Sequence, residues 1–209
     1  MLSGLFAGGR APVTTTIPLF PLRTVLFPGG LLPLKVFEQR YIDMTKACLK
    51  DGLPFGVVLI TAGDEVATRG GTPAFANLGT LATITGWDMP ELGILHVATE
   101  GLTRFQVREH RVQPDRLVVA DVVDIPGEPK VPLPADAQPL ARLLELIASR
   151  VGPQNFPADL DYGDATWVGY RLAEVLPLPL PIKQSMLEIN DAQVRLQVLQ
   201  KFLSQQGLL

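Results

Sequence analysis

Three side chains of the sequence belong to the types that most often bind metals or act as nucleophiles near neutral pH: Cys48, His96 and His110. The two histidines fall in neighbouring strands of a predicted hairpin, where their rings could approach each other. Zinc would still require a third ligand, and no cysteine or aspartate lies at a recognisable spacing. We therefore expect no metal site and two partly exposed strand histidines.

Two other motifs suggest chemistry but lack a required part. The acidic segment at residues 159–164 resembles a calcium loop, yet the twelfth loop position is Tyr170, where a bidentate glutamate is needed. Asp164 is better explained as the N-cap of a helix. Lys183 and Ser185 stand two residues apart on a predicted helix and do not face each other, and no lysine lies in a phosphate-binding loop. We expect no catalytic and no cofactor-binding residue.

The elements that position these side chains change type along the chain. Before residue 126, short segments rich in Val, Ile, Leu and Thr predict strands that form a barrel or sandwich. One helix interrupts them, because Phe37, Tyr41, Met44 and Cys48 recur at helical spacing and Gly52 can end it. The predicted strands are residues 17–22, 30–36, 55–62, 78–87, 93–99, 102–111 and 116–125.

The second half of the chain predicts helices. Leucines and small residues recur at helical spacing from Leu140 to Val151, and a second helix should follow the Asp164 N-cap and end before Pro177. Two more helices are predicted at residues 182–189 and 192–206, so we expect a four-helix bundle. The predicted division is a flexible start at 1–16, a β-rich domain at 17–125, a proline-rich linker at 126–139 and a helical subdomain at 140–209.

Composition limits the function classes. The 209 residues are 47% hydrophobic and 19% charged, and 18 basic against 21 acidic residues give a net charge of -3. This charge disfavours nucleic acid as the main partner, although Arg104, Arg108, Arg111 and Arg116 form one basic cluster. The longest stretch without a charge, residues 70–87, is broken by glycine and threonine and does not predict a membrane helix. The first residues lack a signal-peptide pattern, so we expect a cytoplasmic protein.

Three segments resemble motifs of the Lon protease amino-terminal domain family, and most closely its stand-alone branch. They are IPLFPLR with VLFPGGLLPL and FEQRY at residues 17–41, LGTLATI at 78–84, and EGLTRFQV at 100–107. Further on, KQSMLE at residues 183–188 is similar to a later helix of the family. The order and spacing of these motifs extend the resemblance over nearly the whole chain after residue 17.

The resemblance implies an α+β fold: a PUA-like β pseudobarrel with one inserted helix, followed by the helical bundle. It also implies recognition of unfolded or degron-bearing polypeptides. Full-length Lon proteases carry an ATPase and a Ser-Lys peptidase module, and the sequence has no motif of either. We therefore expect a non-enzymatic binding protein or an adaptor for a protease. An RNA-binding module remains the alternative, because PUA-like barrels bind RNA, and a homodimer is left open.

The first motif is unusually rich in apolar and aromatic side chains, which are either core residues or contacts for a bound polypeptide. Arg40 and Arg104 lie inside the motifs and should be structural, with Glu38 and Glu100 as candidate carboxylate partners. The candidate peptide-binding residues are Phe20, Leu22, Phe27, Leu31, Phe37 and Tyr41.

Overall fold

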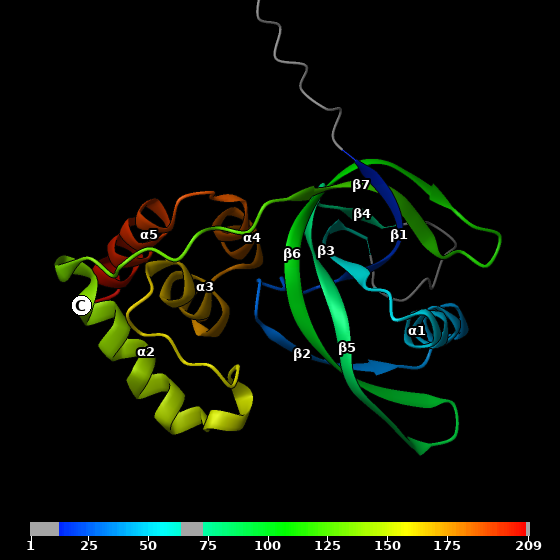
Figure 1. Ribbon diagram of the computed structural model, residues 1–209, viewed down its shortest axis with the longest axis horizontal. Coiled ribbons are helices and arrows are strands. Elements are labelled where there is room, and N and C mark those ends of the chain that lie inside the picture. The colour runs from blue at the N-terminus through cyan, green and yellow to red at the C-terminus, as the bar shows by residue number, and fades with distance from the viewer. Residues whose placement is uncertain (1–12, 64–72, 208–209) are drawn as a thin grey trace, which may run out of the picture.

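A closed β-barrel forms one lobe of the protein, and four α-helices form the other (Figure 1). The computed structural model describes residues 13–63 and 73–207. The sheet runs in the order β1, β7, β6, β5, β3, and a parallel pairing of β1 with β3 closes it. All other pairings are antiparallel. The barrel strands are β1 (Thr14–Leu22), β3 (Phe55–Ala62), β5 (Leu78–Glu91), β6 (Ile94–Val112) and β7 (Val118–Ile125).

Strand β1 has different neighbours along its length. Its first part, residues 14–19, pairs with β7, whereas residues 19–22 pair with β3. Pro18 lacks an N–H group and stands just before the pairing with β3 begins. The first residues of β1 are therefore bonded to a neighbouring strand on one side only, within the described part of the chain.

The two segments predicted as strands 93–99 and 102–111 are one continuous strand, β6. Gly101, which suggests a turn, instead permits a close approach, because a Cβ there would lie 2.2 Å from the carbonyl oxygen of Phe27. The backbone confirms this contact: Gly29 N–H donates to Gly101 O, and Gly101 N–H donates to Gly30 O. The first part of β6 also pairs with β2 (Leu31–Val36), and helix α1 (Gln39–Asp51) packs against the barrel beside them.

Helices α2 (Gln138–Val151), α3 (Ala165–Val175), α4 (Leu180–Glu188) and α5 (Ala192–Gln205) form the second lobe. The predicted Asp164 N-cap is present: its carboxylate accepts the N–H of Thr166. Asp191 caps α5 in the same way. Two short 3₁₀ segments, Ala135–Ala137 and Pro153–Asn155, flank α2. Among the described residues, no helix combines the length and apolar character needed to cross a bilayer.

Three apolar clusters hold the fold together. One fills the barrel around Leu19, Phe105 and Ala120, and a second lies between the barrel and α1. The third is the core of the helical lobe, and it extends into the barrel through Phe27 and Leu59. The two lobes therefore share one apolar cluster, whose burial stabilises their contact.

Some boundaries differ from the sequence expectation. Residues 14–16, expected in a flexible start, already belong to β1, because they pair with residues 121–123 of β7. Residues 1–12 lie outside the described residues. Strand β4 (Ala74–Phe75) is too short to show any alternation and was not expected. The α+β class is as predicted, and the sheet is mainly antiparallel.

Candidate functional site

A buried carboxylate lies where the barrel meets the helical lobe. Glu128, in the segment that leaves β7, is 5% exposed at its side chain and contacts two buried arginines. Arg195 binds it through two nitrogens, at 2.5 and 3.0 Å, and Arg104 lies 3.2 Å away. The hydroxyl of Tyr170 donates to the same carboxylate. One anion thus compensates two cations that water cannot reach.

This cluster ties strands to helices. Arg104, on β6, donates to the carbonyl oxygen of Leu187 at 2.7 Å, and Arg195, on α5, donates to that of Met186 at 3.0 Å. Burial raises the pKa of Tyr170, which stays a neutral hydrogen-bond donor. These contacts join a barrel strand to the helical lobe, and a structural role for Arg104 stays a prediction. Its ion-pair partner is Glu128, however, and not the expected Glu100.

A second polar contact between the lobes surrounds the turn at residues 27–30. Arg171 of α3 is buried, donates to the carbonyl oxygen of Pro28 at 2.8 Å and lies 3.2 Å from Glu174. A Cβ on Gly30 would lie 2.2 Å from a carboxylate oxygen of Glu174, so glycine allows this approach. Burial raises the pKa of Glu174 and lowers that of Arg171. This cluster also fixes the relative position of the lobes.

Arg40 has the partner that the sequence suggested. Its guanidinium lies 2.8 Å from the carboxylate of Glu38 and donates to the carbonyl oxygen of Arg116 at 2.9 Å. It also stacks over the ring of Tyr41, with 4.5 Å between the guanidinium carbon and the ring centroid. These contacts link the start of α1 to the loop before β7, which is a structural role.

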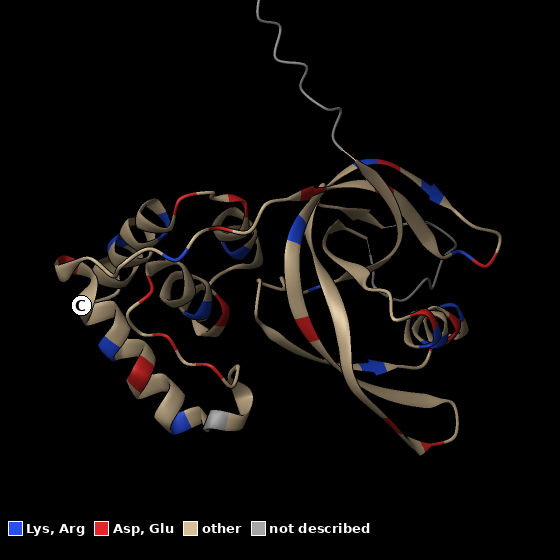
Figure 2. Cartoon of the chain, viewed as in Figure 1, with Lys and Arg blue, Asp and Glu red and all other residues tan. Residues whose placement is uncertain are grey.

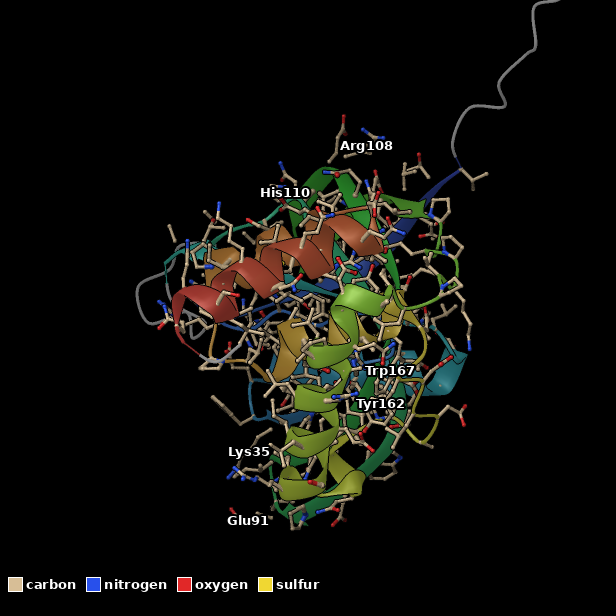
Figure 3. All side chains as sticks on the ribbon, turned by 90° about the vertical axis from the view of Figure 1, so that its left-hand side faces the viewer. Lys35, Glu91, Arg108, His110, Tyr162 and Trp167 are labelled. Carbon is tan, nitrogen blue, oxygen red and sulfur yellow. The ribbon has the colours of Figure 1, made fainter. Side chains whose placement is uncertain are left out.

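The histidines do not face each other across a hairpin, because both lie on β6. His96 pairs with Lys35 of β2, and His110 contacts the ring of Phe75. Lys35 and His110 lie at opposite ends of the molecule in Figure 3. Within residues 13–63 and 73–207, no three histidine, cysteine or acidic side chains are grouped so that they could hold a metal ion.

The candidate peptide-binding residues separate into two groups. Phe20, Leu22, Phe27 and Tyr41 are buried, and the rings of Phe20 and Tyr41 stack at 4.0 Å. These four contribute to the clusters that hold the fold together. Phe37, 56% exposed, and Leu31 remain accessible at the two ends of β2. A binding role for these two stays a prediction.

An open apolar groove lies between α1 and the first part of β1. Helix α1 lies on the side of the barrel away from the helical lobe (Figure 1). We call this groove the α1–β1 groove, and its volume is about 350 Å³. One side of α1 supplies side chains at helical spacing. The groove is lined by residues 15–18 of β1, by Met44, Ala47, Cys48 and Asp51 of α1, by Leu53 and Pro54 before β3, and by Leu81, Leu117 and Asp124.

The local sequence explains this groove. Gly52, in a left-handed conformation, ends α1, and the N–H of Leu53 returns to the carbonyl oxygen of Cys48. This turn leaves Leu53 61% exposed beside β1. Burial and, to a lesser degree, Asp51 raise the pKa of Cys48, so its thiol is protonated and apolar in character at neutral pH.

A second hollow, of about 500 Å³, lies on the outer face of β2, β5 and β6. We call it the hairpin hollow. Ala98 and Gly86 are paired at its base, and no side chain lies close above Gly86. Trp87 lines it, 59% exposed, and Leu92 at the tip of the β5–β6 hairpin is fully exposed. The hollow is more open and more polar than the α1–β1 groove, because Lys35, Asp88 and His96 line it.

The predicted basic cluster does not form a common surface. Arg104 is buried against Glu128, and Arg111 lies 3.7 Å from Asp121. Figure 2 shows basic and acidic residues interspersed over both lobes. This distribution does not favour a phosphate-backbone interface.

The sequence did not indicate the α1–β1 groove as a site. Of the predicted helical stripe, Tyr41, Met44 and Cys48 are buried on α1, whereas Phe37 precedes the helix and is exposed. Ala47 and Asp51, which line the groove, were not part of that stripe. The only other signal was the unusual row of threonines before residue 17, which we expected to be part of a flexible start.

The structure thus combines a closed barrel, which carries an apolar groove, with a helical lobe joined to it by buried ion pairs. The chain belongs to the family described as the ATP-dependent protease La (LON) substrate-binding domain, whose model matches residues 16–205. The family predicted from the three motifs is thereby confirmed.

Two curated relatives are Lon proteases. The enzyme of Phenylobacterium zucineum (strain HLK1) is 27% identical over 204 residues, which are 95% of this chain and 25% of the relative. Lon protease 2 of Myxococcus xanthus is 32% identical over 101 residues, covering 48% of this chain and 12% of the relative. The chain therefore spans about a quarter or less of the length of these relatives.

Solved structures show the same fold. The Lon N-terminal domain protein of Xanthomonas campestris has a TM-score of 0.73 and 35% identity, and the match covers 90% of this chain and 98% of that one. The N-terminal domain of the Mycobacterium avium complex Lon protease has a TM-score of 0.58 at 19% identity, with coverage of 91% and 98%. The second likeness concerns the fold alone.

Proposed function

We propose that this protein captures apolar segments of unfolded or degron-bearing polypeptides, without itself catalysing a reaction, and can present them to a protease. The α1–β1 groove is the observation that carries the proposal. Recognition of many unfolded sequences needs accessible apolar surface with few demands on side-chain identity, and the groove supplies such a surface. The family description as a substrate-binding domain supports the same reading.

This proposal also includes four expectations from the sequence. They are a PUA-like barrel, a bundle arrangement of the helices, a cytoplasmic location and the four-part division of the chain. RNA binding, the alternative that a PUA-like barrel suggests, gains no support from the dispersed arginines. A homodimer is left open.

Fluorescence anisotropy with a labelled, permanently unfolded polypeptide tests the function. The folded form of that polypeptide and a single-stranded RNA serve as controls, each at low and high salt. We expect binding to the unfolded chain alone, with little dependence on salt, because apolar burial is weakly screened. Retention of RNA that falls steeply with salt would instead favour the RNA-binding alternative.

A matched pair of surface variants locates the site. Leu53→Ser removes an exposed leucine from the α1–β1 groove, and Leu92→Ser removes one from the hairpin tip. Neither side chain is in the core, so both variants should fold. We expect weaker binding only for Leu53→Ser. The reverse result would move the site to the tip of the β5–β6 hairpin.

A further inference from the structure

The first part of β1 is an open sheet edge. Residues 14–18 pair with β7 on one side, and no described strand pairs with their other side until Leu19 meets Gly56 of β3. Side chains of residues 14–16 are exposed. In a strand, alternate backbone N–H and C=O groups point to opposite edges, so the groups of residues 14–17 on this edge have no strand partner among the described residues.

Gly56 marks the point where β3 reaches β1. A Cβ there would lie 2.6 Å from a methyl carbon of Leu19 and 2.9 Å from one of Ile17, so glycine leaves room for these two β1 side chains. Before Gly56 the chain leaves β1, and Leu53 and Pro54 become a wall of the α1–β1 groove. The β1–β3 pairing that closes the barrel therefore does not extend to residues 14–17, within the described part of the chain.

The α1–β1 groove follows this open edge. Consecutive residues of a strand point to opposite faces, yet residues 15–18 all line the groove. Ile17 contributes to the cluster inside the barrel, whereas Met44 and Leu117 belong to the cluster under α1. A groove lined by side chains from both faces of a strand lies along the edge of that strand. A polypeptide strand added there would place alternate side chains against the cluster inside the barrel and the cluster under α1.

The charge of the groove is acidic. Asp51 from α1 and Asp124 from β7 are exposed and line it, and no lysine or arginine among the described residues does so. An occupant with basic side chains beside its apolar residues would complement these carboxylates, whereas an acidic segment would be repelled.

We propose that the open edge of β1 accepts an extended polypeptide as an added strand, and that the preferred segments carry apolar side chains flanked by lysine or arginine. This inference rests on the proposed function and specifies its substrate class. Backbone hydrogen bonds to residues 14–17 supply affinity that does not depend on sequence, and the α1–β1 groove takes alternate apolar side chains.

Three labelled short peptides test the proposal by anisotropy. The first has an alternating apolar core with lysine flanks, the second has the same core with glutamate flanks, and the third is the first with alternate backbone nitrogens methylated. We expect the second and third to bind about tenfold more weakly than the first, a difference of about 1.4 kcal/mol each. N-methylation removes strand hydrogen bonds without removing apolar surface, so equal binding of the third peptide would overturn strand addition.

Variants with matched controls locate the edge. Ala47→Phe narrows the α1–β1 groove from an exposed position and should weaken the lysine-flanked peptide about tenfold. Gln39→Phe adds the same ring at an exposed position of α1 outside the groove and should have no effect. The double variant Asp51→Asn with Asp124→Asn should reduce the preference for lysine over glutamate flanks. An unchanged preference would overturn the charge argument.

Hydrogen exchange gives a direct reading. Bound peptide should slow exchange of the amides of residues 14–17, while the amides of β2 should be unaffected. If the protein binds unfolded polypeptide, but Ala47→Phe does not weaken this binding and exchange of these amides does not slow, the edge proposal is wrong. The proposed function then still stands. If no unfolded polypeptide binds, both are wrong. Sedimentation that shows edge-dependent self-association without peptide binding would assign the edge to a second copy of the chain and overturn the proposal.

Discussion

Glu128 illustrates how a single side chain can determine the contact between two lobes. Its carboxylate receives hydrogen bonds from Arg195 on α5 and Tyr170 on α3, and it lies 3.2 Å from Arg104 on β6. Removing one partner of a buried ion pair leaves an uncompensated buried charge. The resulting loss of folding stability is larger than the stability that a typical surface ion pair contributes. The residue lies in the proline-rich segment that the sequence presents only as a linker.

We expect Glu128→Gln to lower the free energy of unfolding by about 3–5 kcal/mol, because Arg104 and Arg195 would remain buried without an anion. Urea unfolding followed by circular dichroism measures this change. Lys130→Gln is the control, since Lys130 pairs with Asp161 at an exposed site and its loss should leave stability unchanged. A Glu128→Gln protein as stable as the wild type would show that the carboxylate does not compensate the arginines.

At the scale of elements, α3 and α5 of the second lobe each begin at an aspartate that caps them. Asp191 accepts the N–H groups of Gln193 and Val194 at the start of α5. Asp164 accepts that of Thr166 at the start of α3 and also that of Val131 in the preceding segment. The second cap therefore joins a helix to the chain that crosses the lobe.

We expect Asp191→Ala to destabilise the protein by about 1 kcal/mol, the usual cost of losing a cap. Asp164→Ala should cost about 2 kcal/mol, because the partly buried N–H of Val131 also loses its acceptor. Thermal unfolding of both variants, with exposed Asp159→Ala as control, compares them. Equal losses for the two caps would show that the bond to Val131 contributes nothing.

For the whole molecule, the contact between the lobes should depend on pH through Glu174. Burial raises the pKa of this carboxyl above its ordinary value of 4.5, and Arg171 only partly opposes the effect. The folded protein therefore binds the proton more tightly than the unfolded chain. The stability that Glu174 contributes is fully present below pH 4.5 and is lost as the pH rises through the raised pKa.

Glu174→Gln should remove this part of the pH dependence. Between pH 4.5 and neutrality, the free energy of unfolding of the wild type should fall with rising pH relative to that of the variant. Urea titrations at a series of pH values measure the difference. Parallel profiles for the two proteins would contradict the raised pKa. Glu145→Gln, at an exposed position of α2, is the control for removal of a carboxylate.

The amino-acid sequence by itself determined the elements and the family. Apolar periodicity located α1, α2 and α5, aspartate marked the start of α3, and local motifs identified the Lon substrate-binding family. These features depend on residues near one another in the chain, so sequence patterns record them. One local signal was misleading. Gly101 and its neighbours suggested a turn, whereas β6 continues through Gly101 and passes close to the backbone of residues 27–30.

Only the tertiary structure decided which apolar side chains are accessible and which charges are paired. Phe27 and Phe37 belong to the same motif, yet one is in the core and the other is exposed. Arg104 pairs with Glu128, beyond the end of β7, instead of nearby Glu100. The open edge of β1 exists because β3 joins it only from Leu19 onward. Each of these depends on how distant segments pack, which no local pattern of residues contains.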